Sequence, residues 1–442
     1  MILIASAQVL PDPSRPASTA TRLRGLLMVA FHFPPDNSST GVLRSLKFAR
    51  HLLDLGWRTH VLTVDPALYP QRDPALETQI PPEVSVDRLP CHDAKQRWSI
   101  AGRYPAVVGV PDRFGSWRRP AVRAGLSLVR RGAVQAIYST YPVPSAHLIA
   151  LRLKRRSGLP WIADFRDPWA GGGGRGWRYR IDAWLEHRVV HGADTVIANT
   201  DAAREDFLAR YPRLPAAHFV TLPNGYDESD FSDLPTPDRE YFQIIYPGSI
   251  NRSNRDPTPL LRALGALLRA GRLPRGQTRI TLLGSGPTGT QPWLLELLDA
   301  EGLGDITRVV TERVPYRDSL QRLAGAGLLV VLNEAAGEPS EHLAYARLMV
   351  PAKVYEYLRL GRPFLVLCGD GAIPQLLAQV GQGSACAASD MQRICAHVEQ
   401  AFAAWQTGAG QVVPAEMVAD FERQRLSMGL ATELNRLCPV HQ

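Results

Sequence analysis

Residues 350–367 read VPAKVYEYLRLGRPFLVL, and this stretch decides the fold class because it joins a short helix to an apolar strand. Lys353 and Glu356 are three residues apart, so a helix places both side chains on one face. Gly361 is of the type that commonly ends a helix, and the apolar run at residues 363–367 follows at once. Helices that pass directly into apolar strands are typical of α/β sheets.

The pair of Lys353 and Glu356 suits the two ends of a sugar nucleotide. An ammonium group, together with the positive end of a helix dipole, suits phosphate. A carboxylate suits paired ribose hydroxyls, as acidic residues do in dinucleotide sites. A buried amphipathic helix with one i,i+3 ion pair would show the same spacing, so this stretch alone leaves both interpretations open.

The chain has 442 residues, of which 45% are hydrophobic and 21% are charged, and these values are typical of globular proteins. This length suits two domains of about 200 residues each. No run of about 18 apolar residues predicts a membrane-spanning helix. Residues 1–24 lack a charged region ahead of their short apolar run, so we expect a loose N-terminal arm. Five cysteines without metal-type spacing favour a reducing cytoplasm.

The net charge of +8 is carried mainly by arginines, which cluster in two places. These clusters are Arg118, Arg119, Arg123, Arg130 and Arg131, and Arg152, Lys154, Arg155 and Arg156. Nucleic acid, an anionic membrane surface and phosphorylated substrates are the partners that such charge suits. Neither an aromatic-interleaved RNA motif nor a zinc finger occurs, so nucleic acid is not expected. A solvated arginine-rich face and peripheral contact with an inner membrane both remain open.

Apolar runs alternate with helical patterns along nearly the whole chain, which predicts two parallel α/β sheets. The expected strands lie at residues 26–33, 59–64, 133–138, 161–164, 195–198, 218–222, 243–247, 279–283, 328–332 and 363–367. The acidic, proline-containing segment 227–240 reads as a linker. We therefore expect a Rossmann-like domain at residues 25–226, a second at 241–415, and one long helix at 417–437 within a C-terminal segment of residues 416–442.

Two loops of the first half carry candidate site residues. Residues 31–41, FHFPPDNSSTG, follow the first strand and open a helix at Gly41, which predicts an anion site to which Arg44 adds charge. Residues 161–170, WIADFRDPWA, place Asp167 just beyond a strand, where α/β sites collect. Asp167 suits an acceptor hydroxyl, although an internal pair with Arg166 is an equal alternative. The segment is not an Asp-x-Asp motif, and no metal is expected.

Two glycine-containing loops of the second half follow predicted strands. The first, residues 247–252, reads PGSINR and contains Gly248 and Arg252, with Arg255 soon after. The second, residues 284–287, reads GSGP and contributes Gly284 and Gly286. A short Gly-x-Gly is weak evidence by itself.

Five separated elements resemble, in order, those of family-four-like glycosyltransferases: residues 31–41, 161–170, 223–227, 247–252 and 350–367. The resemblance covers nearly the whole chain and implies the GT-B fold, in which two Rossmann-like domains face each other across a cleft. It implies transfer of a sugar, with retention of configuration and without a metal or other cofactor, from a nucleotide diphosphate sugar to an acceptor hydroxyl. It assigns the diphosphate to Gly41, Gly248, Arg252, Arg255 and Lys353, and the base region to Gly284 and Gly286. Of the two arginines, Arg252 is the favoured candidate, and one of the pair could face solvent. The C-terminal helix is expected to return to the first domain.

Bacterial relatives mostly build surface polysaccharides on lipid carriers at the inner membrane, so the resemblance implies a glycan or lipid-linked acceptor. Two departures keep other readings open. Leu348 stands where many relatives carry an earlier Glu, and Ser139 where many carry a His; His147 and His32 are possible substitutes for that His. The alternatives are a non-catalytic GT-B partner subunit and a nucleotide-sugar 2-epimerase.

Overall fold

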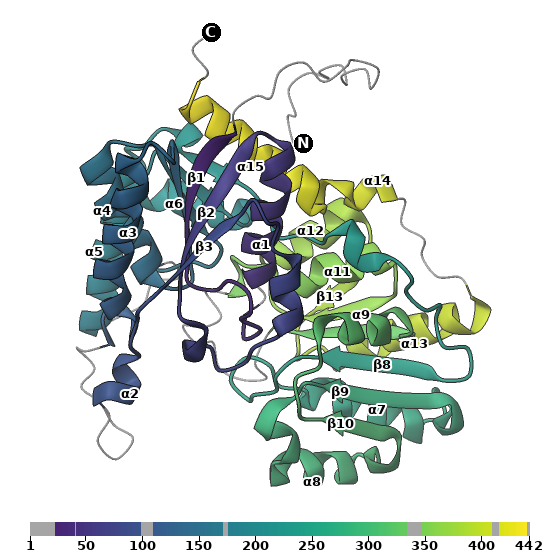
Figure 1. Ribbon diagram of the computed structural model, residues 1–442. Coiled ribbons are helices and arrows are strands. Elements are labelled where there is room, and N and C mark those ends of the chain that lie inside the picture. Colours follow the sequence, from purple (N-terminus) through teal and green to yellow (C-terminus); the bar gives the residue numbers. More distant parts are fainter. Residues whose placement is uncertain are drawn as a thin grey trace, which may run out of the picture.

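The computed structural model describes residues 23–39, 41–98, 109–170, 176–333, 346–408 and 415–439. It contains two parallel sheets, one from each half of the chain (Figure 1). The expected N-terminal arm lies outside the described residues apart from its last two positions.

The first sheet has seven strands in the order β3-β2-β1-β4-β5-β6-β7. Its strands are β1 (Arg24–Ala30), β2 (Trp57–Val64), β3 (Ser85–Leu89), β4 (Ala136–Thr140), β5 (Trp161–Phe165), β6 (Thr195–Ala198) and β7 (Phe219–Thr221). The helices of this half are α1 (Gly41–Asp54), α2 (Ala94–Trp98), α3 (Arg118–Arg130), α4 (Pro144–Ser157), α5 (Gly176–Gly192) and α6 (Asp201–Arg210). Because helices cover both faces, the central strands β1, β4 and β5 are buried throughout or nearly so.

The second sheet has six strands in the order β10-β9-β8-β11-β12-β13. Its strands are β8 (Phe242–Pro247), β9 (Thr278–Leu283), β10 (Thr307–Val310), β11 (Leu328–Leu332), β12 (Phe364–Leu367) and β13 (Ser384–Cys386). The helices are α7 (Thr258–Arg269), α8 (Pro292–Ala300), α9 (Tyr316–Ala324), α11 (Ala352–Leu360), α12 (Ala372–Val380) and α13 (Met391–Thr407). In each sheet the order of the strands reverses next to the strand that comes first in the sequence, β1 in one sheet and β8 in the other. A ligand site is expected at such a switch point.

The prediction of one helix over residues 417–437 is wrong. The chain forms α14 (Ala415–Val418), a short 3-10 turn, and then α15 (Arg423–Leu437). Glu422 between them is extended, and its carboxylate accepts hydrogen bonds from the backbone of Gln424 and Arg425. The helical pattern is interrupted here because Glu422 caps a new helix and its backbone bridges to Tyr226.

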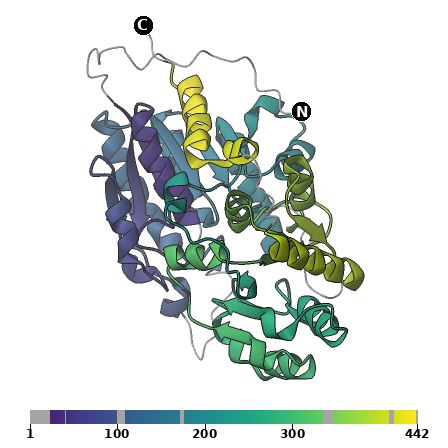
Figure 2. The same cartoon turned by 90° about the vertical axis from the view of Figure 1, so that its right-hand side faces the viewer.

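Helix α15 packs on the first half of the chain, beside α1 (Figures 1 and 2). Leu426, Leu430 and Leu434 are buried in the same cluster as Leu26 and Met28 of β1. The end of the chain therefore covers one face of the first sheet and passes the junction between the two halves. Among the described residues, no helix is both long and apolar enough to cross a membrane.

Candidate active site

Lys353 lies at the carboxyl end of β8, the first strand of the second sheet. It comes from the first turn of α11, and its ammonium group donates to the carbonyl oxygen of Pro247. The Nζ atom also lies 5.4 Å from the ring centroid of Tyr246. The backbone at this place is Gly248, whose φ of 151° is rarely adopted by residues with a side chain, and a Cβ atom there would lie 2.9 Å from Nζ.

The surroundings of Lys353 are positively charged. Burial, with the charges of Arg255 and Arg313, lowers the pKa of Lys353 to about 8, although Glu356 acts in the opposite direction. Among the described residues, no carboxylate forms an ion pair with its amine within 4.0 Å. A cluster of cations without a matching carboxylate is suited to a bound anion.

Glu356 lies one turn further along α11 and is contacted from other parts of the chain. The hydroxyl of Tyr316, at the start of α9, donates to its Oε1 at 3.2 Å. Burial raises the pKa of Glu356 in spite of that hydrogen bond and of the positive charges of Arg423 and Lys353. The structure therefore brings Lys353 and Glu356 together with Tyr316 and Arg423.

The glycines of the second loop have their backbone groups occupied. Gly284 and Gly286 both have φ of 70°, and their N–H groups donate to the carbonyl oxygens of Val310 and Thr311. The N–H of Gly248 donates to Leu283 in the same way. These glycines shape the loops after β8 and β9, and what they offer a ligand is the absence of side chains rather than free donors.

Arg252 and Arg255 have different positions. Arg255 donates to the hydroxyl of Ser249 at 2.6 Å and is one of the charges that act on Lys353. The guanidinium group of Arg252 instead lies 5.3 Å from the ring centroid of Trp293 on α8. The sequence favoured Arg252 of these two arginines for the diphosphate, whereas the charges that act on Lys353 are those of Arg255 and of Arg313, which lies in a loop that the sequence did not single out.

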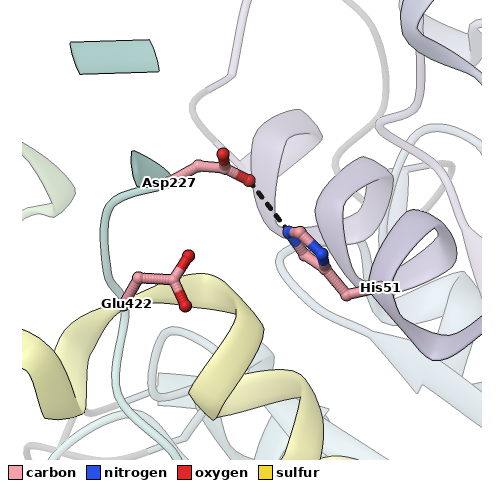
Figure 3. A group of neighbouring side chains, drawn as sticks. All are labelled: His51, Asp227 and Glu422. Carbon is pink, nitrogen blue, oxygen red and sulfur yellow. Dashed lines mark hydrogen bonds and ion pairs between the residues drawn. The ribbon is translucent and has the colours of Figure 1, made fainter. Parts of the chain in front are cut away.

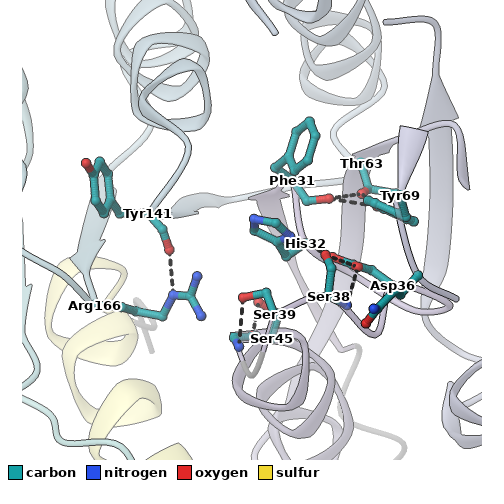
Figure 4. A network of polar contacts seen from close by, with 12 residues as sticks. Phe31, His32, Asp36, Ser38, Ser39, Ser45, Thr63, Tyr69, Tyr141 and Arg166 are labelled. Carbon is teal, nitrogen blue, oxygen red and sulfur yellow. Dashed lines mark hydrogen bonds and ion pairs between the residues drawn. The ribbon is translucent and has the colours of Figure 1, made fainter. Parts of the chain in front are cut away.

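In the first half, the start of α1 is occupied by Arg166 (Figure 4). Its Nε atom donates to the carbonyl oxygen of Tyr141, and a Cβ atom at Gly41 would lie 1.3 Å from its Nη1. The close approach expected at Gly41 is therefore made by this guanidinium group. Burial lowers the pKa of Arg166, and the nearby charges of Asp167 and Asp164 partly oppose this effect. No ion pair within 4.0 Å joins Arg166 to either carboxylate among the described residues.

His32 and Asp167 lie near this guanidinium group. His32 Nδ1 is 2.6 Å from the buried carboxylate of Asp36, which also accepts from Ser38 (Figure 4). Asp167 is half-buried; burial raises its pKa, and the charges of Arg166 and His32 lower it. The first half of the chain thus places a histidine and a carboxylate near the guanidinium group at the start of α1.

Arg44 has a structural role, which corrects the expectation that it adds charge for a phosphate. Its side chain is 1% exposed, and its Nε donates to Asp164 at 2.8 Å. Its terminal nitrogens donate to the carbonyl oxygens of Leu222 and Pro223 and again to Asp164. Burial alone would lower the pKa of Arg44, and the carboxylate of Asp164 outweighs it, so the pKa is raised.

Leu348 and Ser139, the two departures noted in the sequence, and the possible substitute His147 have packing roles. Leu348 packs against the hydrophobic core of the first half of the chain, and its carbonyl oxygen accepts a hydrogen bond from the hydroxyl of Thr200. The hydroxyl of Ser139 lies 2.8 Å from both His147 Nδ1 and Trp161 Nε1. Burial lowers the pKa of His147 to about 3, so this histidine is a neutral core residue and does not replace the missing one.

His51, Asp227 and Glu422 meet where α1, the linker and α15 come together (Figure 3). His51 Nε2 is 3.0 Å from Asp227, and Lys47 is 3.3 Å from the same carboxylate. Burial would raise the pKa of Asp227, but His51 and Lys47 outweigh it and hold the pKa well below its usual range. Because Glu422 also caps α15, this group joins α1 to the linker at the start of that helix.

Comparison with known proteins gives one family and one fold. The family described as "Glycosyl transferase 4-like domain" matches residues 41–225. D-inositol 3-phosphate glycosyltransferase of Kineococcus radiotolerans is 31% identical over 139 residues, 28% of this chain and 31% of the relative. The match therefore spans less than a third of that relative's length.

Solved structures resemble the chain over nearly its whole length. Sucrose-phosphate synthase from Thermosynechococcus elongatus has a TM-score of 0.65 at 15% identity, covering 94% of this chain and 99% of that one. HepE from Anabaena, in complex with UDP and glucose, has a TM-score of 0.63 at 16% identity, covering 93% and 100%. These likenesses, with the two parallel sheets, confirm the predicted GT-B fold.

Proposed function

We propose that this chain, which belongs to the family-four-like glycosyltransferases of the GT-B fold, moves a sugar from a nucleotide diphosphate sugar to an acceptor hydroxyl. One observation carries the proposal: the ammonium group of Lys353 has Arg255 and Arg313 as neighbours and lacks an ion pair with any described carboxylate. A diphosphate would balance this charge. Glu356, one turn further along α11, would accept hydrogen bonds from ribose hydroxyls.

The main chemical task is to stabilise the leaving diphosphate. Preorganised cations do this without rearranging during the reaction. Lys353 and Arg255 would bind its oxygens from the second domain, and Arg166 would approach from the start of α1. Asp167 would orient the acceptor hydroxyl. We expect attack from the face that the diphosphate leaves, with retention of configuration and no metal.

UDP-glucose is the first donor to test, because HepE from Anabaena was solved with UDP-glucose, and with UDP and glucose. We propose a glycan or lipid-linked acceptor, as in bacterial surface polysaccharide or glycoconjugate synthesis. The setting would be the cytoplasmic side of the inner membrane; the cysteine pattern of the sequence supports a reducing compartment.

Thermal shift against UDP, GDP, ADP and their sugars, with and without EDTA, tests the donor site. Stabilisation by one nucleotide that EDTA does not change supports the proposal. No shift with any nucleotide would contradict it and favour a non-catalytic subunit. Release of free sugar from the donor without any acceptor would favour the epimerase, and NMR of the product anomer would test retention.

A further inference from the structure

A groove of about 1190 Å³ lies on the first domain, between α3, α4 and α5. These three helices lie side by side on the outer side of the first sheet (Figure 1). Seven arginines line the groove: Arg118, Arg119, Arg123, Arg152, Arg155, Arg156 and Arg188. The tertiary structure thus joins two basic clusters that are separate in the sequence and adds one arginine from α5.

The charge of the groove is not compensated by the protein. No acidic residue lines it, and none of the seven arginines forms an ion pair with another described residue. Two guanidinium groups have other contacts: Arg118 donates to the carbonyl of Gly115, and Arg188 lies 4.6 Å from the ring centroid of Trp184. Because like charges held together repel one another, such a groove is suited to bind several anions at once.

The groove also has an apolar component. Val122, Leu148, Leu151 and Leu185 contribute to its lining between the arginines. Aliphatic side chains beside guanidinium groups fit a ligand that has both phosphates and hydrocarbon.

Two tryptophans of α5, the helix that contributes Leu185 and Arg188 to the groove, face the solvent. Trp177 is 52% exposed and Trp184 is 55% exposed, and both belong to α5. They are seven residues apart, so they share one face of the helix, with exposed Arg180 between them. Exposed tryptophan with basic residues on one helix is typical of segments that lie in a membrane interface.

We propose that the surface formed by α3, α4 and α5 binds the anionic phospholipid headgroups of a bilayer. The arginines would bind lipid phosphates, and Trp177 and Trp184 would enter the interface between headgroups and acyl chains. The proposal deepens the proposed function, because it names where the chain would meet the membrane that carries a lipid-linked acceptor, and it rests on that function for its purpose. Lipid binding itself requires neither donor nor transfer.

Vesicle co-sedimentation of the full chain tests this surface. The wild type should bind vesicles of phosphatidylglycerol and phosphatidylcholine, bind pure phosphatidylcholine weakly, and dissociate as salt is raised. The triple variant Arg119→Gln/Arg123→Gln/Arg152→Gln should bind the anionic vesicles about a hundredfold more weakly, because each basic residue near such a surface contributes about 1 kcal/mol. Trp177→Ala/Trp184→Ala should also weaken binding, and because the tryptophans contribute apolar contacts, the binding that remains should keep the wild-type dependence on salt.

The matched control removes the same charge from the second domain. Arg262→Gln/Arg308→Gln/Arg322→Gln changes three exposed arginines of α7, β10 and α9 and should leave vesicle binding within about twofold of wild type, because these residues lie outside the proposed surface. Equal loss in both triple variants would overturn the proposal, since net charge alone would then explain binding. A single-stranded oligonucleotide that binds the groove more tightly than the anionic vesicles would also overturn it.

The same variants separate this inference from the proposed function. Each should keep the wild-type melting temperature and the wild-type thermal shift with UDP, because the groove residues are absent from the contacts of Lys353. If the wild type shows the UDP shift but does not bind anionic vesicles, the proposed membrane surface is wrong and the proposed function is unaffected. If the wild type binds anionic vesicles but shows no thermal shift with any nucleotide, the membrane surface is supported and the proposed transferase function is wrong.

Discussion

Arg44 of the first domain and Lys353 of the second are both helix cations near the interdomain junction, and their surroundings differ. Arg44 is buried against Asp164 and two backbone carbonyls, and its pKa is raised. Lys353 lies among Arg255 and Arg313, and its pKa falls to about 8. The fold needs a cation that is buried against a carboxylate, because its loss would leave an uncompensated charge, whereas a cation among other cations is suited to a bound anion.

The largest expected effect concerns Arg44. Arg44→Met leaves the carboxylate of Asp164 buried and unpaired, so we expect the free energy of unfolding to fall by about 3–5 kcal/mol. Urea denaturation measures this, with Arg262→Met on the surface of α7 as the control. Arg44→Met/Asp164→Leu should regain part of the loss. Unchanged stability combined with weaker nucleotide binding would return Arg44 to the role that the sequence predicted.

Lys353 should respond in the opposite way. Lys353→Met removes a charge that the fold does not balance, so stability should be kept or increased. Donor-dependent transfer should fall by about 10²- to 10³-fold in kcat/KM, as for loss of one preorganised donor. A thermal melt checks the expected stability, and steady-state kinetics on the same protein check the expected loss of transfer. A destabilised but active variant would reverse the comparison.

Glu356 tests the other end of the donor. Glu356→Gln keeps the size of the side chain but weakens hydrogen bonds to ribose hydroxyls, so we expect about a tenfold to hundredfold loss in affinity for the donor nucleotide. Isothermal titration with the nucleotide that gives the thermal shift measures this. Tyr316→Phe, which removes the hydroxyl that contacts Glu356, should have a smaller effect of the same kind. Loss of inorganic phosphate binding instead would contradict a ribose role.

Arg255 and Arg252 make the comparison finer. Because Arg255 acts on Lys353 and Arg252 lies over Trp293, Arg255→Gln should weaken nucleotide binding about tenfold, and Arg252→Gln by less than about threefold. The same titration applies to both variants. The reverse order would restore the choice that the sequence suggested.

The last test is the pH dependence of nucleotide affinity. The pKa of Lys353 is about 8 in the free protein, and a bound diphosphate raises it by favouring the ammonium form. Affinity should therefore be nearly full below about pH 7, start to fall near pH 8, and be about tenfold weaker toward pH 9.5. Lys353→Arg, whose guanidinium stays protonated, should flatten the profile over this range. A profile equally steep in that variant would assign the titration to another group.

The sequence predicted the central strands well and did not identify three strands at the edges of the sheets. The strands at residues 195–198 and 328–332 have the predicted bounds because they are buried throughout and, apart from Thr195, apolar. The missed strands β3, β10 and β13 are terminal in their sheets. Their residues are mostly half-buried or exposed, so the apolar pattern that marks a central strand is weak there.

Local sequence determined what depends on a few neighbouring residues: the helix that places Lys353 beside Glu356, its end at Gly361, and the alternation that produces two sheets. Tertiary structure decided which charges meet. Arg313, Tyr316 and Arg423 approach α11 from other segments. Arg166 occupies the space over Gly41, and Asp164 pairs with Arg44. The spacing of side chains on one helix follows from helix geometry, whereas the balance of charge around a group depends on contacts between residues far apart in sequence.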